Sequence, residues 1–362
     1  MKHSIQLLVI LIVLTQSEEA NASPRLPVTA GKSNQTMNVV ATGENARQFT
    51  ISVPAKFESC YATSSCGSNQ FPLVIVLHGF GQTAAKALSW FESGTAGNVN
   101  YLTRKMAFFV APKSLGTAWR QIDPVSPATD PASFADLYFI NELVSLVTGA
   151  YQPAIDPNRI YIFGFSNGAG LAFHLLCFQH QPFRSFAMIS QGIQWESPHC
   201  GAGADNSATA TAVQQDLFQG FPEAQQYGVT NNAKPKPVLY MHGTSDANLS
   251  INDPGATVAQ LQLLNDTVAI PAVITNYRDD PFNIAFTTLH EYFKQPGSRG
   301  RPLAYYETIY GDHSVSSLNP QGTTSCLAGT SQATGTCAHN TDYSAADEAW
   351  NFWNAAAGLN LP

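Results

Sequence analysis

One serine stands where the local sequence could make it a nucleophile. Ser166 lies in the run Gly164-Phe165-Ser166-Asn167-Gly168, between the apolar residues Ile160–Phe163 and the helix-forming run Leu171–Cys177. A Gly-x-Ser-x-Gly turn that joins a strand to a helix pushes the serine hydroxyl out at the carboxyl end of the strand, and it needs small residues on both sides. Ser166 is therefore predicted to attack a carbonyl carbon. The alternative is a glycine-rich turn in which the serine only caps the helix.

A serine hydroxyl becomes a nucleophile when a base removes its proton and an acid orients that base. On folds with this kind of turn, the acid and then the base follow the serine along the chain. The strand-like run Val238–Met241 leads to Asp246, and the strand-like run Leu303–Ile309 leads to His313. We predict that Asp246 is the acid and that His313 is the base.

Other residues could fill these two roles. Asp253 is the alternative acid, in which case Asp246 would only cap a turn. Among the other histidines that follow the acid, His339 lies in the Ser/Thr/Gly-rich loop Thr323–Asn340, and His290 is expected on a helix face within Thr287–Phe293. Neither position suits a base as well as a loop directly after a strand.

A second loop is predicted to stabilise the oxyanion of a tetrahedral intermediate, which needs two free N–H groups. The apolar strand Pro72–Leu77 ends in His78-Gly79-Phe80-Gly81, which places backbone N–H groups near the carboxyl edge of the sheet. We predict that the N–H of Asn167, the residue after the nucleophile, is one donor and that the N–H of Phe80 is the second.

Three further side chains near these motifs could serve either structure or function. His78 resembles a base at first sight, but it is expected to hold its own loop in place. His242 is expected to hydrogen-bond the loop that carries Asp246. Trp119 could line a substrate cleft and bind a flat ligand, or it could belong to the core.

These motifs, in this order, resemble the secreted esterases grouped with polyhydroxybutyrate depolymerases and feruloyl or acetylxylan esterases. The matching residues are Leu77–Gln82, Gly164–Gly168, His242–Asp246, the loop at His313, Asp136–Phe139, Asp156–Tyr161 and Glu348–Trp353. The resemblance implies an α/β-hydrolase that cleaves carboxylic esters without a cofactor. Similar members often carry Trp-Pro soon after the catalytic histidine, whereas Ser314-Val315-Ser316-Ser317 follows His313 here.

The elements that must position these residues alternate between strands and helices. Phe134–Val147 shows apolar residues at spacings of three and four, as an amphipathic helix does, and Ser344–Ala357 has a similar pattern. Such alternation predicts an α/β fold with a mostly parallel central sheet and helices on both faces. We expect one catalytic domain over residues 23–362, with insertions near 198–235 and 250–300. The strand-like runs are Gln48–Val53, Pro72–Leu77, Ala107–Ala111, Ile160–Phe163, Phe186–Ile189, Val238–Met241 and Leu303–Ile309.

The amino terminus predicts export. Lys2 and His3 precede a short apolar run, and Ala20-Asn21-Ala22 forms a cleavage site, so residues 1–22 are expected to be a signal peptide. The mature protein would be extracellular or periplasmic. The 362 residues carry a formal charge of −7 and only 12% charged residues, so nucleic acid, membranes and an obligate protein partner are not expected.

The cysteines agree with an oxidising compartment, because an even number is typical of disulfides. Pairing of nearest neighbours gives Cys60–Cys66, Cys177–Cys200 and Cys326–Cys337, and each pair would close a loop rich in small polar residues. The alternative, a metal site, lacks a Cys-x-x-Cys pair and histidines at ligand spacing. No metal and no cofactor are expected.

Three functions remain open at this point. The leading one is a secreted serine esterase that acts on polyhydroxybutyrate-type polyester or its oligomers. The second is a feruloyl or acetylxylan esterase that acts on plant polysaccharide, with a peptidase on the same fold as a lesser alternative. The third is a non-catalytic binding protein that has kept the hydrolase fold, because a fold alone does not prove an activity.

Overall fold

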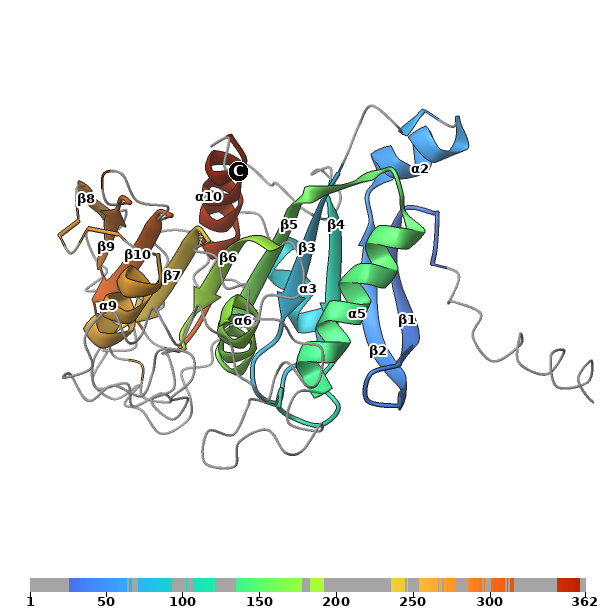
Figure 1. The fold of residues 1–362 in the computed structure, drawn as a ribbon, viewed down its shortest axis with the longest axis horizontal. Helices are drawn as coiled ribbons and strands as arrows, with labels where there is room; N and C mark the ends of the chain where they lie inside the picture. Colours follow the sequence, from blue (N-terminus) through green and yellow to red (C-terminus); the bar gives the residue numbers. More distant parts are fainter. Residues whose placement is uncertain are drawn as a thin grey trace, which may run out of the picture.

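The structure is a computed structural model in which one central sheet contains strands from β1 near the amino terminus to β10 (Figure 1). Within these residues the strands form one 10-stranded sheet in the order β1-β2-β4-β3-β5-β6-β7-β10-β9-β8. The structure describes residues 26–63, 65–66, 71–92, 102, 107–120, 135–177, 183–191, 236–244, 246, 254–265, 267–268, 270–271, 273–277, 286–294, 296, 301–309, 311, 313–315 and 344–358.

The centre of the sheet is parallel and its two edges are antiparallel. Neighbouring strands run parallel from β4 through β3, β5, β6 and β7 to β10. The pairs β1–β2, β2–β4, β10–β9 and β9–β8 are antiparallel. The strands are β1 (Gly31–Val39), β2 (Glu44–Val53), β3 (Phe71–Leu77), β4 (Phe108–Pro112), β5 (Ile155–Phe165), β6 (Phe183–Ile189), β7 (Val238–Gly243), β8 (Val273–Tyr277), β9 (Phe286–Tyr292) and β10 (Leu303–Ile309).

Helices cover both faces of the sheet, which confirms the predicted α/β architecture. Helices α5 and α6 lie on one face, and α3 and α10 lie on the other (Figure 1). The helices are α2 (Ala55–Ala62), α3 (Ala84–Glu92), α5 (Ala135–Ala150), α6 (Asn167–Cys177), α9 (Pro254–Asn265) and α10 (Ala345–Gly358). None of these helices has both the length and the apolar character that crossing a membrane requires.

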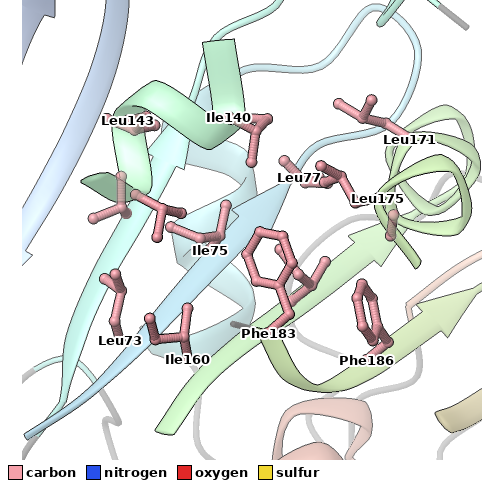
Figure 2. Packing of buried hydrophobic residues seen from close by; sticks show 14 of the residues in the cluster. Leu73, Ile75, Leu77, Ile140, Leu143, Ile160, Leu171, Leu175, Phe183 and Phe186 are labelled. Carbon is pink, nitrogen blue, oxygen red and sulfur yellow. The ribbon is translucent and has the colours of Figure 1, made fainter. Parts of the chain in front are cut away.

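Strand β3 is apolar throughout because its side chains are buried on both faces of the sheet. Leu73, Ile75 and Leu77 point into the core beneath α5 and α6 (Figure 2), whereas Val74 and Val76 point into the core beneath α3 and α10. All five side chains are fully buried. A strand with helices on both faces has no polar side, so the usual alternation is lost. Each such side chain contributes roughly 1.5–3 kcal/mol by leaving water.

The region around residues 250–300 contains elements that the sequence did not reveal. Its described residues form α9 and the strands β8 and β9, which extend the sheet beyond β10. The predicted helix at Thr287–Phe293 is wrong, because His290 lies in β9. Burial alternates over Thr287–His290, with Thr287 and Leu289 inside, and the strand pairs with β10. Most of the expected insertion near 198–235 lies outside the described residues.

One of the three expected disulfides lies within the described residues. Cys60 at the end of α2 is bonded to Cys66, which confirms that pair. The pairs Cys177–Cys200 and Cys326–Cys337 involve side chains outside the described residues. The single confirmed bridge closes a short loop beside the buried Phe57 ring.

One buried histidine gives the fold a predictable pH dependence. His174 on α6 is fully buried, and burial lowers its pKa from 6.5 to about 4. Its Nδ1 atom has no hydrogen-bond partner among the described residues. Because the folded-state pKa is the lower one, the unfolded chain binds a proton more readily, and stability is lost as the pH falls from 6.5 towards 4.

We expect His174→Leu to weaken the loss of stability in acid. Between pH 7.5 and pH 5, His174 alone should cost the wild-type protein about 2 kcal/mol of unfolding free energy. Urea unfolding at the two pH values measures this difference in wild type and variant. An equal pH dependence in both proteins would contradict a neutral buried imidazole.

Candidate active site

The turn after β5 has the geometry that the Gly-x-Ser-x-Gly pattern predicts. Ser166 has a φ angle of 52°, a left-handed backbone conformation that residues other than glycine rarely adopt. Its N–H donates to the carbonyl of Ile189 on β6 at 2.8 Å, and its own carbonyl accepts the N–H groups of Ala169 and Gly170. Backbone hydrogen bonds on both sides thus hold a strained residue at the start of α6.

The two glycines of the turn are required by close backbone contacts. A Cβ atom on Gly164 would lie 2.6 Å from the Gly168 carbonyl oxygen. A Cβ atom on Gly168 would lie 2.5 Å from the carbonyl oxygens of both Leu77 and His78, at the end of β3. Real Cβ atoms do not approach so closely, so only glycine lets the elbow pack against β3.

The structure brings Ser166, His313 and Asp246 together in one hydrogen-bonded chain. The distance from His313 Nε2 to Ser166 Oγ is 2.8 Å, and the distance from His313 Nδ1 to Asp246 Oδ2 is 2.7 Å. A carboxylate only accepts, so the Nδ1–H donates to Asp246, and Nε2 is left to accept the serine hydroxyl proton. The side chain of Asp246 is 1% exposed and that of His313 is 14% exposed.

The parallel strands explain why residues far apart in sequence meet here. Ser166, Asp246 and His313 follow β5, β7 and β10, and carboxyl ends of parallel strands lie along one edge of a sheet. The ends of β7 and β10 are joined by a 2.9 Å hydrogen bond from the Thr244 N–H to the Thr308 carbonyl. The ring of Phe165 lies 5.1 Å from the His313 ring and packs beside it.

The contact between Gly168 and the end of β3 joins the turn that carries Asn167 to the loop that carries Phe80. Asn167 immediately precedes Gly168, and Phe80 follows two residues after His78, whose carbonyl Gly168 touches. Among the described residues no acceptor is found for the Phe80 N–H. The neighbouring Gly81 N–H donates to the Thr117 carbonyl at 2.6 Å, which fixes the loop.

His78 holds its loop, as predicted. The imidazole is fully buried; its Nε2 accepts the Ser114 N–H at 3.2 Å, and its Nδ1 lies 2.8 Å from the Gly79 carbonyl, to which it donates. Burial lowers the pKa of His78, so the ring is neutral at neutral pH, as this donor–acceptor pattern requires.

For Trp119 the structure supports the core alternative over a cleft wall. The side chain is only 2% exposed. Its indole N–H donates to the His78 carbonyl at 2.8 Å, and its ring packs 4.8 Å from the His78 ring. Trp119 therefore supports the predicted oxyanion loop from within. The sequence could not separate these alternatives, because the partner lies 41 residues away.

The structure tests the expected role of His242 at one of its two ring nitrogens. It is buried at the end of β7 and stacks on Tyr240, and its Nδ1 atom has no hydrogen-bond partner among the described residues. Burial lowers its pKa, and the Asp246 carboxylate partly opposes this. The expected hydrogen bond to the Asp246 loop is thus not made through Nδ1. The alternative residues Asp253 and His339 lie outside the described residues.

The strand order, the parallel centre and the turn after β5 decide the fold. The chain has the α/β-hydrolase fold. The prolyl oligopeptidase family model matches residues 143–276 of this α/β-hydrolase, a stretch that contains Ser166 and Asp246. Feruloyl esterase D of Neurospora crassa is 24% identical over 180 residues, which cover 48% of this chain and 54% of that protein. The chain thus spans about half the length of this curated relative.

Solved structures of hydrolases also resemble the chain. An S-formylglutathione hydrolase from Agrobacterium tumefaciens aligns with a TM-score of 0.44 at 15% identity, over 80% of this chain and 90% of that chain. A feruloyl esterase module from Clostridium thermocellum aligns with a TM-score of 0.39 at 12% identity, over 67% and 77%.

Gly168→Ala tests the packing of the elbow against β3. The added methyl group must push the elbow away from the Leu77 and His78 carbonyls, so we expect a loss of about 1–3 kcal/mol in unfolding free energy together with a loss of ester turnover. Gly149→Ala on α5 is the matched control, because a Cβ atom there meets nothing within 4 Å. Chemical denaturation and initial rates measure both effects. Unchanged stability and rates in Gly168→Ala would contradict the contact.

Proposed function

We propose that this chain is a secreted carboxylic-ester hydrolase with Ser166 as nucleophile, His313 as base and Asp246 as the residue that orients the base. The observation that carries the proposal is the hydrogen-bonded chain from Ser166 through His313 to the buried Asp246 carboxylate. A binding protein would have no need for a nucleophile in a strained turn aligned with a base.

The reaction proceeds in two halves on these groups. His313 Nε2 takes the proton of Ser166 as its Oγ attacks the ester carbonyl carbon, and the N–H groups of Phe80 and Asn167 hold the oxyanion. The protonated His313 then gives this proton to the leaving alkoxide, which departs as the alcohol. Water, deprotonated by His313, attacks the acyl-enzyme carbonyl. The bond to Ser166 Oγ then breaks, His313 returns the proton to this oxygen, and the carboxylic acid leaves. Asp246 stabilises the imidazolium in both halves.

For the substrate we propose an ester with a bulky apolar or aromatic part. Phe80 is 67% exposed although it is large and apolar, and its backbone N–H is a proposed oxyanion donor. Leu115, on the loop hydrogen-bonded to this one, is also exposed. The name of the curated relative favours a feruloyl ester, and polyhydroxybutyrate-type polyester or acetylated xylan are the alternatives. A parallel assay on methyl ferulate, polyhydroxybutyrate film and acetylated xylan distinguishes them.

Export belongs to the same proposal. Residues 1–22 have the sequence of a signal peptide, and the Cys60–Cys66 disulfide suits an oxidising compartment. Detection of the mature protein outside the cytoplasm, beginning near residue 23, supports export. Retention of residues 1–22 in the cytoplasm contradicts it.

A second candidate is hydrolysis of peptide bonds, favoured by the match to the prolyl oligopeptidase family model. Both reactions can use the same three residues, since each passes through a tetrahedral intermediate and an acyl-enzyme. Dipeptide p-nitroanilides compared with p-nitrophenyl esters separate the two. We expect turnover of the esters alone.

Ser166→Ala tests the nucleophile. Removing the hydroxyl should lower kcat for p-nitrophenyl acetate by about 10⁴-fold or more while the protein stays folded. Ser59→Ala on α2 is the matched control and should keep the wild-type rate. Equal rates in wild type and Ser166→Ala would place the nucleophile elsewhere, and no turnover by wild type would support the non-catalytic alternative.

Phe80→Ser tests the contact with the apolar part of the substrate. We expect KM for methyl ferulate to rise about fivefold to tenfold, which corresponds to loss of part of the burial of one aromatic ring, while p-nitrophenyl acetate is affected less. Val40→Ser, another exposed apolar residue, serves as control because it lies between β1 and β2. A similar effect on both esters would argue against a substrate contact by Phe80.

A further inference from the structure

The segment Ser114–Arg120, here termed the bridging segment, is hydrogen-bonded both to the loop after β3 and to Asn167. It follows β4 and is hydrogen-bonded to the loop after β3 at three points. Its Ser114 N–H donates to His78 Nε2, its Thr117 carbonyl accepts the Gly81 N–H, and its Trp119 indole N–H donates to the His78 carbonyl. The position of the predicted oxyanion loop therefore depends on this segment.

The side chain of Asn167 holds the same segment from the other side. Its Oδ1 accepts the Trp119 N–H at 2.6 Å, and its Nδ2 donates to the Trp119 carbonyl at 3.5 Å. Asn167 thus has two tasks in one residue. Its backbone N–H is a proposed oxyanion donor, and its side chain ties that donor to the segment that also holds the Phe80 loop.

A buried carboxylate fixes the next residue of the bridging segment. The Arg120 N–H donates to Asp136 Oδ2 at 2.6 Å, and Arg47 Nη2 donates to Asp136 Oδ1 at 2.6 Å. Asp136 is fully buried and Arg47 is 1% exposed, with its guanidinium carbon 4.0 Å from the centre of the Phe139 ring. Glu44 accepts hydrogen bonds from both Arg47 and Arg120, at 2.6 and 2.9 Å.

A buried ion pair of this kind is a poor source of net stability, because removing two charges from water costs about as much as their attraction returns. Apolar residues of similar volume often serve a core equally well. What they cannot supply is an acceptor aimed at a single backbone N–H. Oδ2 of Asp136 has that geometry, since it accepts the backbone N–H of Arg120. Arg120 directly follows Trp119, whose backbone is hydrogen-bonded to Asn167.

We propose that Asp136, held in place by Arg47, is a positioning residue that sets the distance between the two oxyanion donors through the bridging segment. The inference rests on the proposed function, because it assigns Asp136 a role in that reaction. An oxyanion exists in the transition state and not in the bound ester. A shift of its donors therefore lowers kcat and leaves KM nearly unchanged.

The test compares Asp136→Asn with the pair Arg47→Met/Asp136→Leu. Asp136→Asn replaces two acceptor oxygens with one oxygen and one NH2 group, so it cannot accept from both Arg47 and Arg120 in the native arrangement, and it can lose stability. The double variant removes both charges, keeps an apolar core and leaves the Arg120 N–H without its acceptor. In folded protein, both should lower kcat for p-nitrophenyl acetate about tenfold or more, with KM within about threefold of wild type. Affinity for a trifluoromethyl ketone, which forms an oxyanion on Ser166, should fall by the same factor as kcat/KM.

A double-mutant cycle decides whether Asp136 acts through Asn167. Asn167→Ala keeps the backbone N–H and removes the grip on Trp119, so its loss of kcat and that of Asp136→Asn should overlap and not multiply. Asp156→Asn, which breaks the Asp156–Arg159 pair near the opposite end of β5, is the control with unchanged kcat. A kcat within twofold of wild type, a rise in KM alone, or independent losses in the cycle would overturn the positioning role. Absence of ester turnover in wild type would instead overturn the proposed function.

Discussion

The close contact of Gly168 with the carbonyl oxygens of Leu77 and His78 determines how the rest of the site is arranged. No side chain fits between the elbow and the end of β3, so the nucleophile turn and the oxyanion loop are held at backbone distance. This contact aligns the start of α6 with the loop at Phe80. Two residues before Gly168, Ser166 has a strained φ angle of 52°, and its hydrogen bond to Ile189 helps to hold that conformation. This geometry requires glycine at positions 164 and 168.

Four histidines show how environment, and not residue type, assigns a role. His313 is partly exposed, and its two ring nitrogens contact a carboxylate and a hydroxyl, as in a hydrogen-bonded serine–histidine–aspartate arrangement. His78 is buried, and both of its ring nitrogens are hydrogen-bonded to backbone groups, so it is a neutral side chain that holds two loops together. His174 and His242 are buried with an unpaired Nδ1 among the described residues, and burial lowers the pKa of each. Of these four described histidines, His313 alone has the surroundings of a base.

The parts of the fold that follow from local pattern could be predicted from the sequence. β3, β5, β7 and β10 are runs of apolar residues bounded by turns, and the serine, aspartate and histidine follow three of them in order. The strand β9 could not be predicted, because Thr287–Phe293 is ambiguous in isolation and its alternating burial arises from pairing with β10.

The support behind the site could not be predicted for a different reason. Arg47 and Asp136 are 89 residues apart, and Trp119 and Asn167 are 48 residues apart. No spacing rule links such residues, since they meet only when β2, α5 and the bridging segment pack together. Asp136 therefore looks like an ordinary acidic residue in the first turn of a helix. Its buried partners distinguish it, and these are visible only in the folded chain.

If Ser166 is the nucleophile, it becomes covalently acylated during turnover. Acid quenching during steady-state hydrolysis of an aromatic ester, followed by peptide mapping with mass spectrometry, tests it directly. We expect an acyl group on the peptide that contains Ser166, present while substrate remains and absent after it is consumed. An active protein that never carries an acyl group, or that carries it on another residue, would contradict the account.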